Sequence, residues 1–313
     1  MDGKIILITG GTGSFGNAAT VRLLETNVKE IRIFSRSEFD QEQMRNRISD
    51  KRLSFYIGDV RDAASLKPAM HGVNYVFHAA AMKVVPTCEA FPMQAVMTNI
   101  LGSEIVFQSA IDAGVERLVA LSTDKACYPL NAMGISKAML ERLLTAKARQ
   151  STSTVFVATR FGNVLSSRGS VIPFFVNQIK SGLPITVTDL KMTRYLLTLS
   201  EAVELVLYAL TEGKQGDLFV KKAPATTVLM IANALKSIMN ADNPIEIIGS
   251  RRGEKLDETL VTSDEMTRAE DCGAFYRIHM DTKERDEGTE YTSANTRQLC
   301  FMETVKLLEP YVG

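Results

Sequence analysis

The chain has 313 residues, of which 45% are hydrophobic and 23% are charged, and 36 basic residues balance 36 acidic ones. This length and composition allow one large or two modest globular domains with a sizeable core. The balanced charge provides no overall field for nucleic acid or an anionic membrane, so we expect neither as a partner. Apolar runs are too short for a membrane span, and residues 5–9 are too few for a signal peptide, which predicts a cytoplasmic protein without membrane insertion.

The cysteines predict no special chemistry. Cys88, Cys127, Cys272 and Cys300 are widely spaced, form no CxxC pair and are accompanied by only three histidines. Neither a disulfide framework nor a zinc site has this spacing. We therefore expect reduced thiols and no bound metal.

The first expected elements are a buried strand over 4–9, a glycine turn and a helix. Gly10, Gly13 and Gly16 form the pattern G-x-x-G-x-x-G directly after the strand. Without Cβ atoms the turn can tighten, a pyrophosphate can approach the backbone, and the helix N-terminus can receive the phosphate charge. In this context the glycines favour a dinucleotide-binding turn over an ordinary strand-to-helix turn.

The second strand, 31–34, ends in Ser35 and Arg36, where a dinucleotide's adenosine ribose is expected. An acid here would accept hydrogen bonds from a 2′-hydroxyl, whereas Arg36 offers a guanidinium to a 2′-phosphate. The sequence thus favours NADP over NAD. An exposed arginine is the alternative, and the nearby Glu38 and Asp40 weaken the basic character of the site.

Two further strands, 53–57 and 75–78, end in segments suited to a cofactor. After the first, Asp59 and Val60 could hold an adenine, although Asp59 could instead cap the next helix. After the second, Ala79, Ala80 and Ala81 leave room for a cofactor backbone, and we interpret His78 as a packed strand residue. Lys83 lies just beyond, facing either substrate or water.

A helix is expected next, because Met93, Val96, Met97 and Ile100 recur at helical spacing and form a predicted core stripe. Asn99 interrupts this stripe with a polar amide. If buried, Asn99 must find hydrogen-bond partners, and the loop after Leu121 is a plausible source.

The central motif follows a fifth strand, 117–122. It places Ser122, Thr123, Asp124 and Lys125 at the carboxyl end of the strand and before a helix, where α/β proteins build their sites. Asp124 and Lys125 are a candidate acid and base. The two residues alone favour the alternative of a solvated loop with an incidental ion pair.

Strands alternate with helices up to a sixth strand over 154–160, which predicts an α/β fold with a Rossmann-type doubly wound parallel sheet. We assign 1–165 to a nucleotide-binding domain, with 193–225 returning to it through a helix that stops at Gly213 and a strand near 216–221. Residues 166–192 and 226–313 form a smaller substrate domain, with a helix capped by Thr226 or Thr227. The polar last 40 or so residues suggest a covering segment.

The motifs TGGTGSFG, GDVRD, HAAAMKVVP, LSTDKA, RFGNVLSSRGSVIPFF and RRGEK occur in this order over nearly the whole chain. As a set they resemble the extended short-chain dehydrogenase/reductases. Within these, the chain is most similar to UDP-N-acetylglucosamine 4,6-dehydratases that invert carbon 5. That resemblance implies an NADP-dependent enzyme acting on a UDP-sugar for surface polysaccharide synthesis.

The usual catalytic Tyr-x-x-x-Lys of these enzymes is replaced here by Met133 and Lys137. A thioether cannot take a proton from a sugar hydroxyl as a phenol can. However, YPLNAMGISK, VVPTCEAFPMQAV and KKAPATT resemble the capsular and N-acetylfucosamine-pathway subgroup, which carries Met-x-x-x-Lys. Met133 is therefore interpreted as a trait of that subgroup.

The resemblance implies a role for each matching position. Chemistry falls to Asp124 and Lys125, in the company of Thr123, Lys137 and Met133. The expected cofactor-binding residues are Gly10, Thr12, Gly13, Ser14, Phe15, Gly16, Ser35, Arg36, Asp59, Val60, Ala79, Ala80, Ala81, Asn99, Ser122 and Lys137. The expected substrate-binding residues are Lys83, Asn163, Val171, Thr193, Arg194, Arg251 and Glu254, with Arg251 on the diphosphate and Glu254 on the uridine ribose.

Two departures from the family pattern qualify these implications. Asp40 stands where relatives often have a lysine that can help bind the 2′-phosphate, which weakens the preference for NADP. The segment 281–291 is shorter than the C-terminal latch of the capsular enzymes, which leaves open how the site closes.

The predicted reaction is oxidation at carbon 4, elimination of water across carbons 5 and 6, and return of the hydride to carbon 6. Lys125 would be the base at carbon 5 and Asp124 the acid at carbon 6, so Lys125 must be neutral and Asp124 protonated. Lys125, Thr123 or an ordered water could take the proton from the carbon 4 hydroxyl. The alternatives are a UDP-sugar 4-epimerase, a dehydratase that also epimerises carbon 3, and a non-catalytic NADP-binding sensor. The resemblance also predicts a homo-oligomer, a dimer or hexamer.

Overall fold

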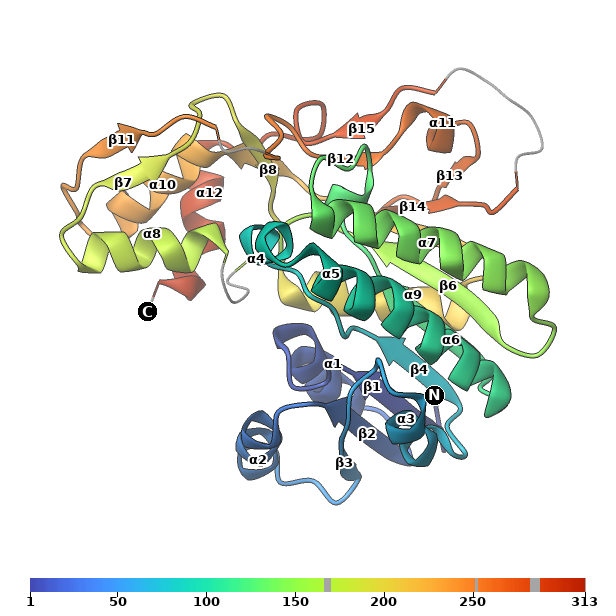
Figure 1. Ribbon diagram of the computed structural model, residues 1–313. Helices are drawn as coiled ribbons and strands as arrows, with labels where there is room; N and C mark the ends of the chain where they lie inside the picture. The colour runs from blue at the N-terminus through green and yellow to red at the C-terminus, as the bar shows by residue number, and fades with distance from the viewer. Residues whose placement is uncertain (166–169, 251–252, 282–287, 313) are drawn as a thin grey trace.

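A nine-stranded sheet forms the centre of the computed structural model, which describes residues 1–165, 170–250, 253–281 and 288–312 (Figure 1). Seven strands are parallel, and two antiparallel strands extend one edge. In spatial order the strands are β13 (Ala269–Asp271), β14 (Phe275–Ile278), β9 (Leu218–Lys221), β6 (Val155–Arg160), β5 (Arg117–Leu121), β4 (Tyr75–His78), β1 (Ile5–Thr9), β2 (Glu30–Ser35) and β3 (Leu53–Ile57). The predicted doubly wound α/β sheet is confirmed.

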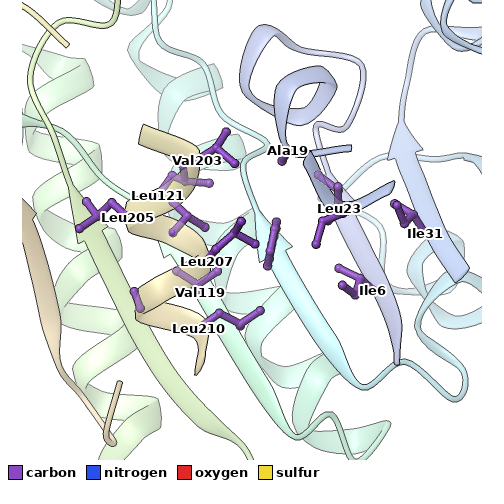
Figure 2. Close-up of a cluster of buried hydrophobic side chains, with 14 of the residues drawn as sticks. Ile6, Ala19, Leu23, Ile31, Val119, Leu121, Val203, Leu205, Leu207 and Leu210 are labelled. Carbon is purple, nitrogen blue, oxygen red and sulfur yellow. The ribbon is translucent and has the colours of Figure 1, made fainter. Parts of the chain in front are cut away.

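Both faces of this sheet are buried, because successive strand residues point to opposite sides. In β1, Ile6 and Ile8 join one core cluster and Leu7 joins the other. Figure 2 shows the first cluster, in which Val203 and Leu207 face Val119 and Leu121. The helices of that face are α1 (Ser14–Leu24), α2 (Glu38–Arg47) and α9 (Leu199–Glu212), whereas α3 (Ala63–Met70), α6 (Gly102–Asp112) and α7 (Ala132–Gln150) cover the other.

Before α6 the chain does not form the regular helix that was predicted. Two short helices, α4 (Val85–Ala90) and α5 (Pro92–Ala95), lead into a π-helical segment, Val96–Leu101. The wider π turn changes the helical register, so that Thr98 and Asn99 are buried while Met93 is 64% and Met97 39% exposed. The predicted core stripe was therefore wrong in this part of the chain.

A second lobe lies beside the sheet, at the left in Figure 1. Its core joins Ile172, Phe175, Ile231, Leu235 and Leu308. The side chain of Thr227 accepts a hydrogen bond from the Met230 N–H, which confirms Thr227 as the helix cap. The elements of this lobe are α8 (Val171–Lys180), β7 (Ile185–Val187), α10 (Val228–Ile238), β11 (Ile245–Ile247), α12 (Phe301–Leu308) and a 3₁₀ turn, Glu309–Tyr311.

The C-terminal residues, which were predicted to form a covering segment, also pack into the core and pair with another strand. Leu308 of α12 is fully buried against α10, and the strand β15 (Tyr291–Thr292) pairs with β12 (Thr259–Val261). The polar composition hid these elements because only one face of α12 is apolar. Residues 282–287, which belong to the predicted covering segment, lie outside the described ranges.

The chain also crosses between the two predicted domains. Strand β9 pairs within the central sheet and α9 packs on it, whereas β8 (Thr193–Tyr195) pairs with β10 (Ala225–Thr227) away from that sheet. Conversely, β13 and β14, which were assigned to the substrate domain, add a hairpin to the edge of β9. An antiparallel hairpin needs no crossover helix, so this short segment can return to a distant sheet. A short helix, α11 (Ser263–Met266), precedes it.

No helix within the described ranges is both long and apolar enough to cross a bilayer.

Candidate active site

A cavity of about 970 Å³ opens at the carboxyl ends of the parallel strands. Every predicted catalytic residue and every predicted cofactor-binding residue except Asn99 contributes to its wall. Strand ends that are distant in the sequence meet here because they lie at one edge of the same sheet. Other wall residues are Phe34, Ser37, Asp40, Gly58, Lys83, Val84, Val85, Pro86, Thr98, Leu121, Phe161, Gly162, Asn163, Val164, Ser170 and Leu199.

The glycine turn packs too tightly for larger residues. A Cβ atom at Gly10, where φ is +66°, would lie 2.8 Å from the Cα of Ala80. A Cβ atom at Gly16 would lie 2.3 Å from the carbonyl oxygen of Gly11. Helix α1 begins after Gly13 with no side-chain cap, so its N-terminal end presents backbone N–H groups and a positive dipole at the cavity. This end of the cavity suits a pyrophosphate.

Beside the glycine turn, where Gly10 and Gly11 donate to the Phe34 carbonyl, the cavity wall carries a cation and a carboxylate. The side chain of Arg36 is 64% exposed, with Nη1 3.9 Å from Asp59 Oδ2. Asp59 is held by Arg61, whose Nη2 donates to Oδ2 at 2.6 Å, and this contact lowers the pKa of Asp59. Helix α3 is capped by Asp62, so the alternative capping role of Asp59 was wrong. Both Arg36 and Asp59 remain available at the cavity wall.

Asp124 and Lys125 form a buried ion pair, not a solvated one. Asp124 is fully buried, and its Oδ1 accepts hydrogen bonds from Thr123 Oγ1 at 2.8 Å and Lys125 Nζ at 3.0 Å. The Lys125 ammonium also lies 3.4 Å from Glu258 Oε1. Asp124 Oδ2 is buried, and no residue within the described ranges forms a hydrogen bond with it. A carboxylate oxygen without a partner is costly in an apolar interior, so a structural salt bridge accounts poorly for this arrangement.

The environment of Lys125 favours its charged form. Burial lowers the pKa of Lys125, but the negative charges of Asp124 and Glu258 outweigh burial and raise the pKa above its usual value. Lys125 is therefore an ammonium at neutral pH. The neutral Lys125 that the predicted chemistry requires is not the resting state, because the mutual attraction of the pair prevails.

Lys137 and Met133 lie one helical turn apart on α7. Lys137 Nζ donates to the carbonyl of Leu121 at 2.8 Å, and burial lowers the pKa of Lys137 to about 8. Met133 is 4% exposed and packs with Cys88, Ala95 and other apolar residues. Met133 therefore presents a small apolar surface to the cavity where a tyrosine would present a hydroxyl.

Two polar residues beside the cavity are structural. His78 is buried between Thr9 Oγ1 at 2.8 Å and Ser103 Oγ at 2.9 Å, and burial and the Lys137 charge lower its pKa to about 3. This confirms His78 as a packed, neutral strand residue. Asn99 bonds to the backbone of Met82 and to Ser136, not to the loop after Leu121, because the π-helical turn directs it inward.

The residues predicted to hold the substrate divide into two groups. Lys83 and Asn163 line the cavity. Thr193 and Arg194 do not, because Thr193 Oγ1 donates to Asp257 at 2.5 Å and Arg194 donates to the carbonyls of Lys255 and Leu256. Strand β8 thereby anchors the segment 255–258. Val171 begins α8 and Glu254 belongs to the segment before β12, both outside the cavity lining, and Arg251 lies outside the described residues.

Sequence reasoning missed Glu258, which is 3% exposed and contacts Lys125. No motif singled it out, because its relation to Lys125 joins positions more than a hundred residues apart. All four cysteines are free, and in the described parts of the chain no cluster of three His, Cys, Asp or Glu side chains could hold a metal ion.

Comparisons with known proteins agree with this geometry. A family model described as "Polysaccharide biosynthesis protein" matches residues 6–280. The chain belongs to the polysaccharide biosynthesis protein family. The predicted resemblance to extended short-chain dehydrogenase/reductases is thereby confirmed at the level of the family.

Family relatives and solved structures match over most of their length. A protein named UDP-glucose 4-epimerase from Rickettsia rickettsii is 52% identical, with 97% of this chain and 95% of the relative covered. The crystal structure of Pen from Bacillus thuringiensis is 36% identical, with a TM-score of 0.93 and coverage of 98% and 97%. DesIV, a dTDP-glucose 4,6-dehydratase from Streptomyces venezuelae solved with NAD and TYD, shares the fold at 24% identity, a TM-score of 0.74 and coverage of 80% and 86%.

Proposed function

We propose that this protein is a UDP-N-acetylglucosamine 4,6-dehydratase that inverts carbon 5 and produces a UDP-4-keto-6-deoxy-L-sugar. The observation that carries the proposal is the buried Asp124–Lys125 pair on the cavity wall. Elimination of water needs a group that removes the carbon 5 proton and another that protonates the departing carbon 6 hydroxyl. A paired amine and carboxyl supply both functions.

The pair can reach its active form without exchanging a proton with solvent. An ammonium beside a carboxylate contains the same number of protons as a neutral amine beside a carboxylic acid. Transfer of one proton across the 3.0 Å contact from Lys125 to Asp124 therefore converts the resting ion pair into a base and an acid. Lys125 would then take the proton from carbon 5, and Asp124 would give its proton to the carbon 6 oxygen.

The wall of the cavity fits a nicotinamide dinucleotide. The glycine turn and the start of α1 suit the pyrophosphate, and Ala79, Ala80 and Ala81 provide a wall of small side chains. The chemistry that this cofactor would supply when bound is removal of a hydride from carbon 4 and its return to carbon 6. A proton from solvent would then add to carbon 5 from the face opposite the one that Lys125 deprotonated, which inverts that carbon. We favour NADP over NAD because Arg36 lies at the ribose end, although Asp40 lines the same region.

The proton on the carbon 4 hydroxyl needs an acceptor other than residue 133. Among the described lining residues near Met133, Lys125 and Lys137 are amines, and Thr123 is a hydroxyl hydrogen-bonded to Asp124. Lys137 donates to the Leu121 carbonyl, which leaves Lys125, Thr123 or an ordered water as acceptors. The diphosphate and ribose roles of Arg251 and Glu254 remain predictions.

The second candidate is UDP-sugar 4-epimerase, which the names of the Rickettsia relatives favour. Simple epimerisation removes and returns hydrogen at one carbon, so it needs one acceptor for the hydroxyl proton and no acid for a leaving group. The Asp124–Lys125 pair supplies an acid that epimerisation does not need. Position 133 is Met and not Tyr, so the usual acceptor for the hydroxyl proton is missing as well. A non-catalytic NADP sensor would require no acid/base pair at all.

The purified protein incubated with UDP-N-acetylglucosamine in D₂O, and followed by NMR, tests the proposal. We expect a carbon 6 methyl group, a hydrated carbon 4 ketone, and deuterium at carbon 5 in the L-configuration. A product with an intact carbon 6 hydroxymethyl group and inverted carbon 4 would establish the epimerase instead. Deuterium at carbon 3 would reveal additional epimerisation, and unchanged UDP-sugars across a panel, with cofactor bound, would indicate a sensor.

Replacing Arg36 by Ala is expected to weaken NADP binding about 10-fold or more while leaving NAD binding nearly unchanged, because a charge-assisted contact to the 2′-phosphate is lost. Fluorescence titration with both dinucleotides measures the two affinities. Arg45→Ala, an exposed substitution on α2, is the control for changed surface charge. An equal loss for NADP and NAD would contradict the assignment of Arg36 to the 2′-phosphate.

The predicted homo-oligomer, the domain division and the cytoplasmic location remain predictions.

A further inference from the structure

Glu258 is a buried carboxylate whose backbone is fixed by hydrogen bonds to Ser293, a residue far from it in the sequence. It immediately precedes β12, and its backbone N–H donates to Ser293 Oγ at 2.8 Å while its carbonyl accepts from the Ser293 N–H at 2.8 Å. The Ser293 hydroxyl lies 2.6 Å from Thr193 Oγ1 of β8. These contacts fix the backbone of Glu258, so its carboxylate cannot easily move to solvent.

The carboxylate of Glu258 contacts the ammonium of Lys125, a residue of the cavity wall. Lys125 Nζ lies between Asp124 Oδ1 at 3.0 Å and Glu258 Oε1 at 3.4 Å. Glu258 does not line the cavity, and its side chain is 4% exposed. Its second oxygen, Oε2, is buried, and none of the described residues forms a hydrogen bond with it or with Oδ2 of Asp124. Such a carboxylate is expensive to bury, which argues for a purpose beyond packing.

The other groups around Lys125 complete the charge balance. Arg194 Nε lies 3.7 Å from Glu258 Oε1, and the positive charge of Arg194 opposes that of Lys125. The Tyr195 hydroxyl donates to the Tyr291 carbonyl at 3.1 Å. It remains neutral, because burial, with contributions from Tyr291, Asp124 and Glu258, raises its pKa. Two carboxylates therefore balance two cations, and Glu258 is the counter-ion of both.

We propose that Glu258 is a positioning residue that keeps the shared proton on the Asp124–Lys125 pair between turnovers. The inference rests on the proposed function, because a pair that works as acid and base must hold one transferable proton when substrate arrives. Burial of Lys125 favours loss of that proton, and Arg194 adds to the tendency. Asp124 and Glu258 oppose it by stabilising the ammonium. Glu258 is not a residue of the cavity wall, so its effect on the reaction passes through Lys125, which is.

The test is the charge of Lys125 measured without any substrate. Competitive acylation of the full chain across a pH series, followed by mass spectrometry of the peptide containing Lys125, reports the pKa of that amine. In Glu258→Gln we expect the pKa of Lys125 to fall by about 1 pH unit or more, because an opposite charge within hydrogen-bonding range shifts a pKa by that amount. Glu246→Gln, an exposed change on β11, should leave it unchanged.

Activity provides the second measurement. The one-proton pair disappears as pH rises through the pKa of Lys125, so the alkaline limb of kcat/KM should move to lower pH in Glu258→Gln. An unchanged pKa of Lys125 in a folded Glu258→Gln would overturn the inference. Should that variant fail to fold, Glu258→Asp is the substitute, because it keeps the negative charge but holds it farther from Lys125. A fall in the pKa of Lys125 smaller than the one expected for Glu258→Gln supports the inference, and no fall overturns it. Because acylation needs no substrate, failure of the proposed dehydratase reaction would be seen separately.

Discussion

Asp124→Asn is expected to reduce formation of the 4-keto-6-deoxy product by about 10²- to 10⁴-fold, the range typical of a lost general acid. Asn has nearly the same shape as Asp but cannot protonate a leaving hydroxyl, and it cannot receive the proton of Lys125. The glycine turn that we propose to hold the cofactor lies between β1 and α1, away from Asp124 in the sequence, so dinucleotide affinity should change little. Product formation followed by NMR and dinucleotide binding followed by titration separate the two effects.

Asp112→Asn is the matched control, because Asp112 is an exposed residue at the end of α6. It should retain the activity of the parent protein. Near-normal turnover in Asp124→Asn would remove Asp124 from the mechanism. Combined loss of turnover and of dinucleotide binding would instead point to a structural role for Asp124 in shaping the cavity.

Arg160→Met is expected to lower the free energy of unfolding by about 3–5 kcal/mol, the usual effect of removing one partner from a buried ion pair. The side chain of Arg160 is 2% exposed at the end of β6 and donates to Glu141 at 2.6 Å, to Glu265 at 2.8 Å and to the Leu260 carbonyl at 2.7 Å. Met preserves much of the volume but leaves two carboxylates without their cation. Urea unfolding monitored by circular dichroism measures the change.

The loss should depend on pH. Burial would raise the pKa of Glu265, but Arg160 and Thr262 lower it below its usual value. A carboxyl with a lowered folded-state pKa stabilises the fold above its unfolded-state pKa, and this contribution disappears as the pH falls through the folded-state value. In Arg160→Met the contribution is absent and burial favours a protonated Glu265. The stability difference from the parent protein should therefore be smaller at about pH 5 than at about pH 8.

Arg149→Met is the control for this prediction. Arg149 pairs with Asp281 on the surface, where the two side chains are 59% and 68% exposed, so its loss should cost less than about 1 kcal/mol. Equal effects of Arg149→Met and Arg160→Met would show that the Arg160 network contributes no more than a surface pair. The network matters for the site because Arg160 holds β12, and Glu258 directly precedes β12.

Local sequence determined the first half of the central sheet and the loops at its carboxyl edge. Apolar runs such as 4–9 and 117–121 are typical of parallel strands that are buried on both faces of a sheet. The residues that follow such strands lie at the same carboxyl edge of the sheet. For this reason Gly10, Arg36, Asp59 and Asp124 could be placed on one cavity before the structure was known. The family motifs added the expected chemistry.

The sequence pattern gave a wrong prediction where the backbone departs from a regular α-helix. Helical spacing placed Met93 and Met97 in the core, but Met93 in α5 and Met97 in the π-helical turn are exposed, and Asn99 of that turn is buried instead. A wider turn depends on how α5, α6 and α7 pack, and nothing in the spacing of apolar residues records that packing. The same limit hid the buried face of α12 within a polar tail.

Only the tertiary structure decided the electrostatics of the candidate site. Asp124 and Lys125 are neighbours in sequence, where they looked like a solvated ion pair, yet they are buried and joined by Glu258 from another part of the chain. The pKa of Lys125 depends on its burial and on its distances to the charges of Asp124, Glu258 and Arg194. These distances are set only when the fold brings β5, β8 and β12 together. Sequence names the groups that can exchange a proton, whereas the folded arrangement decides which of them holds it.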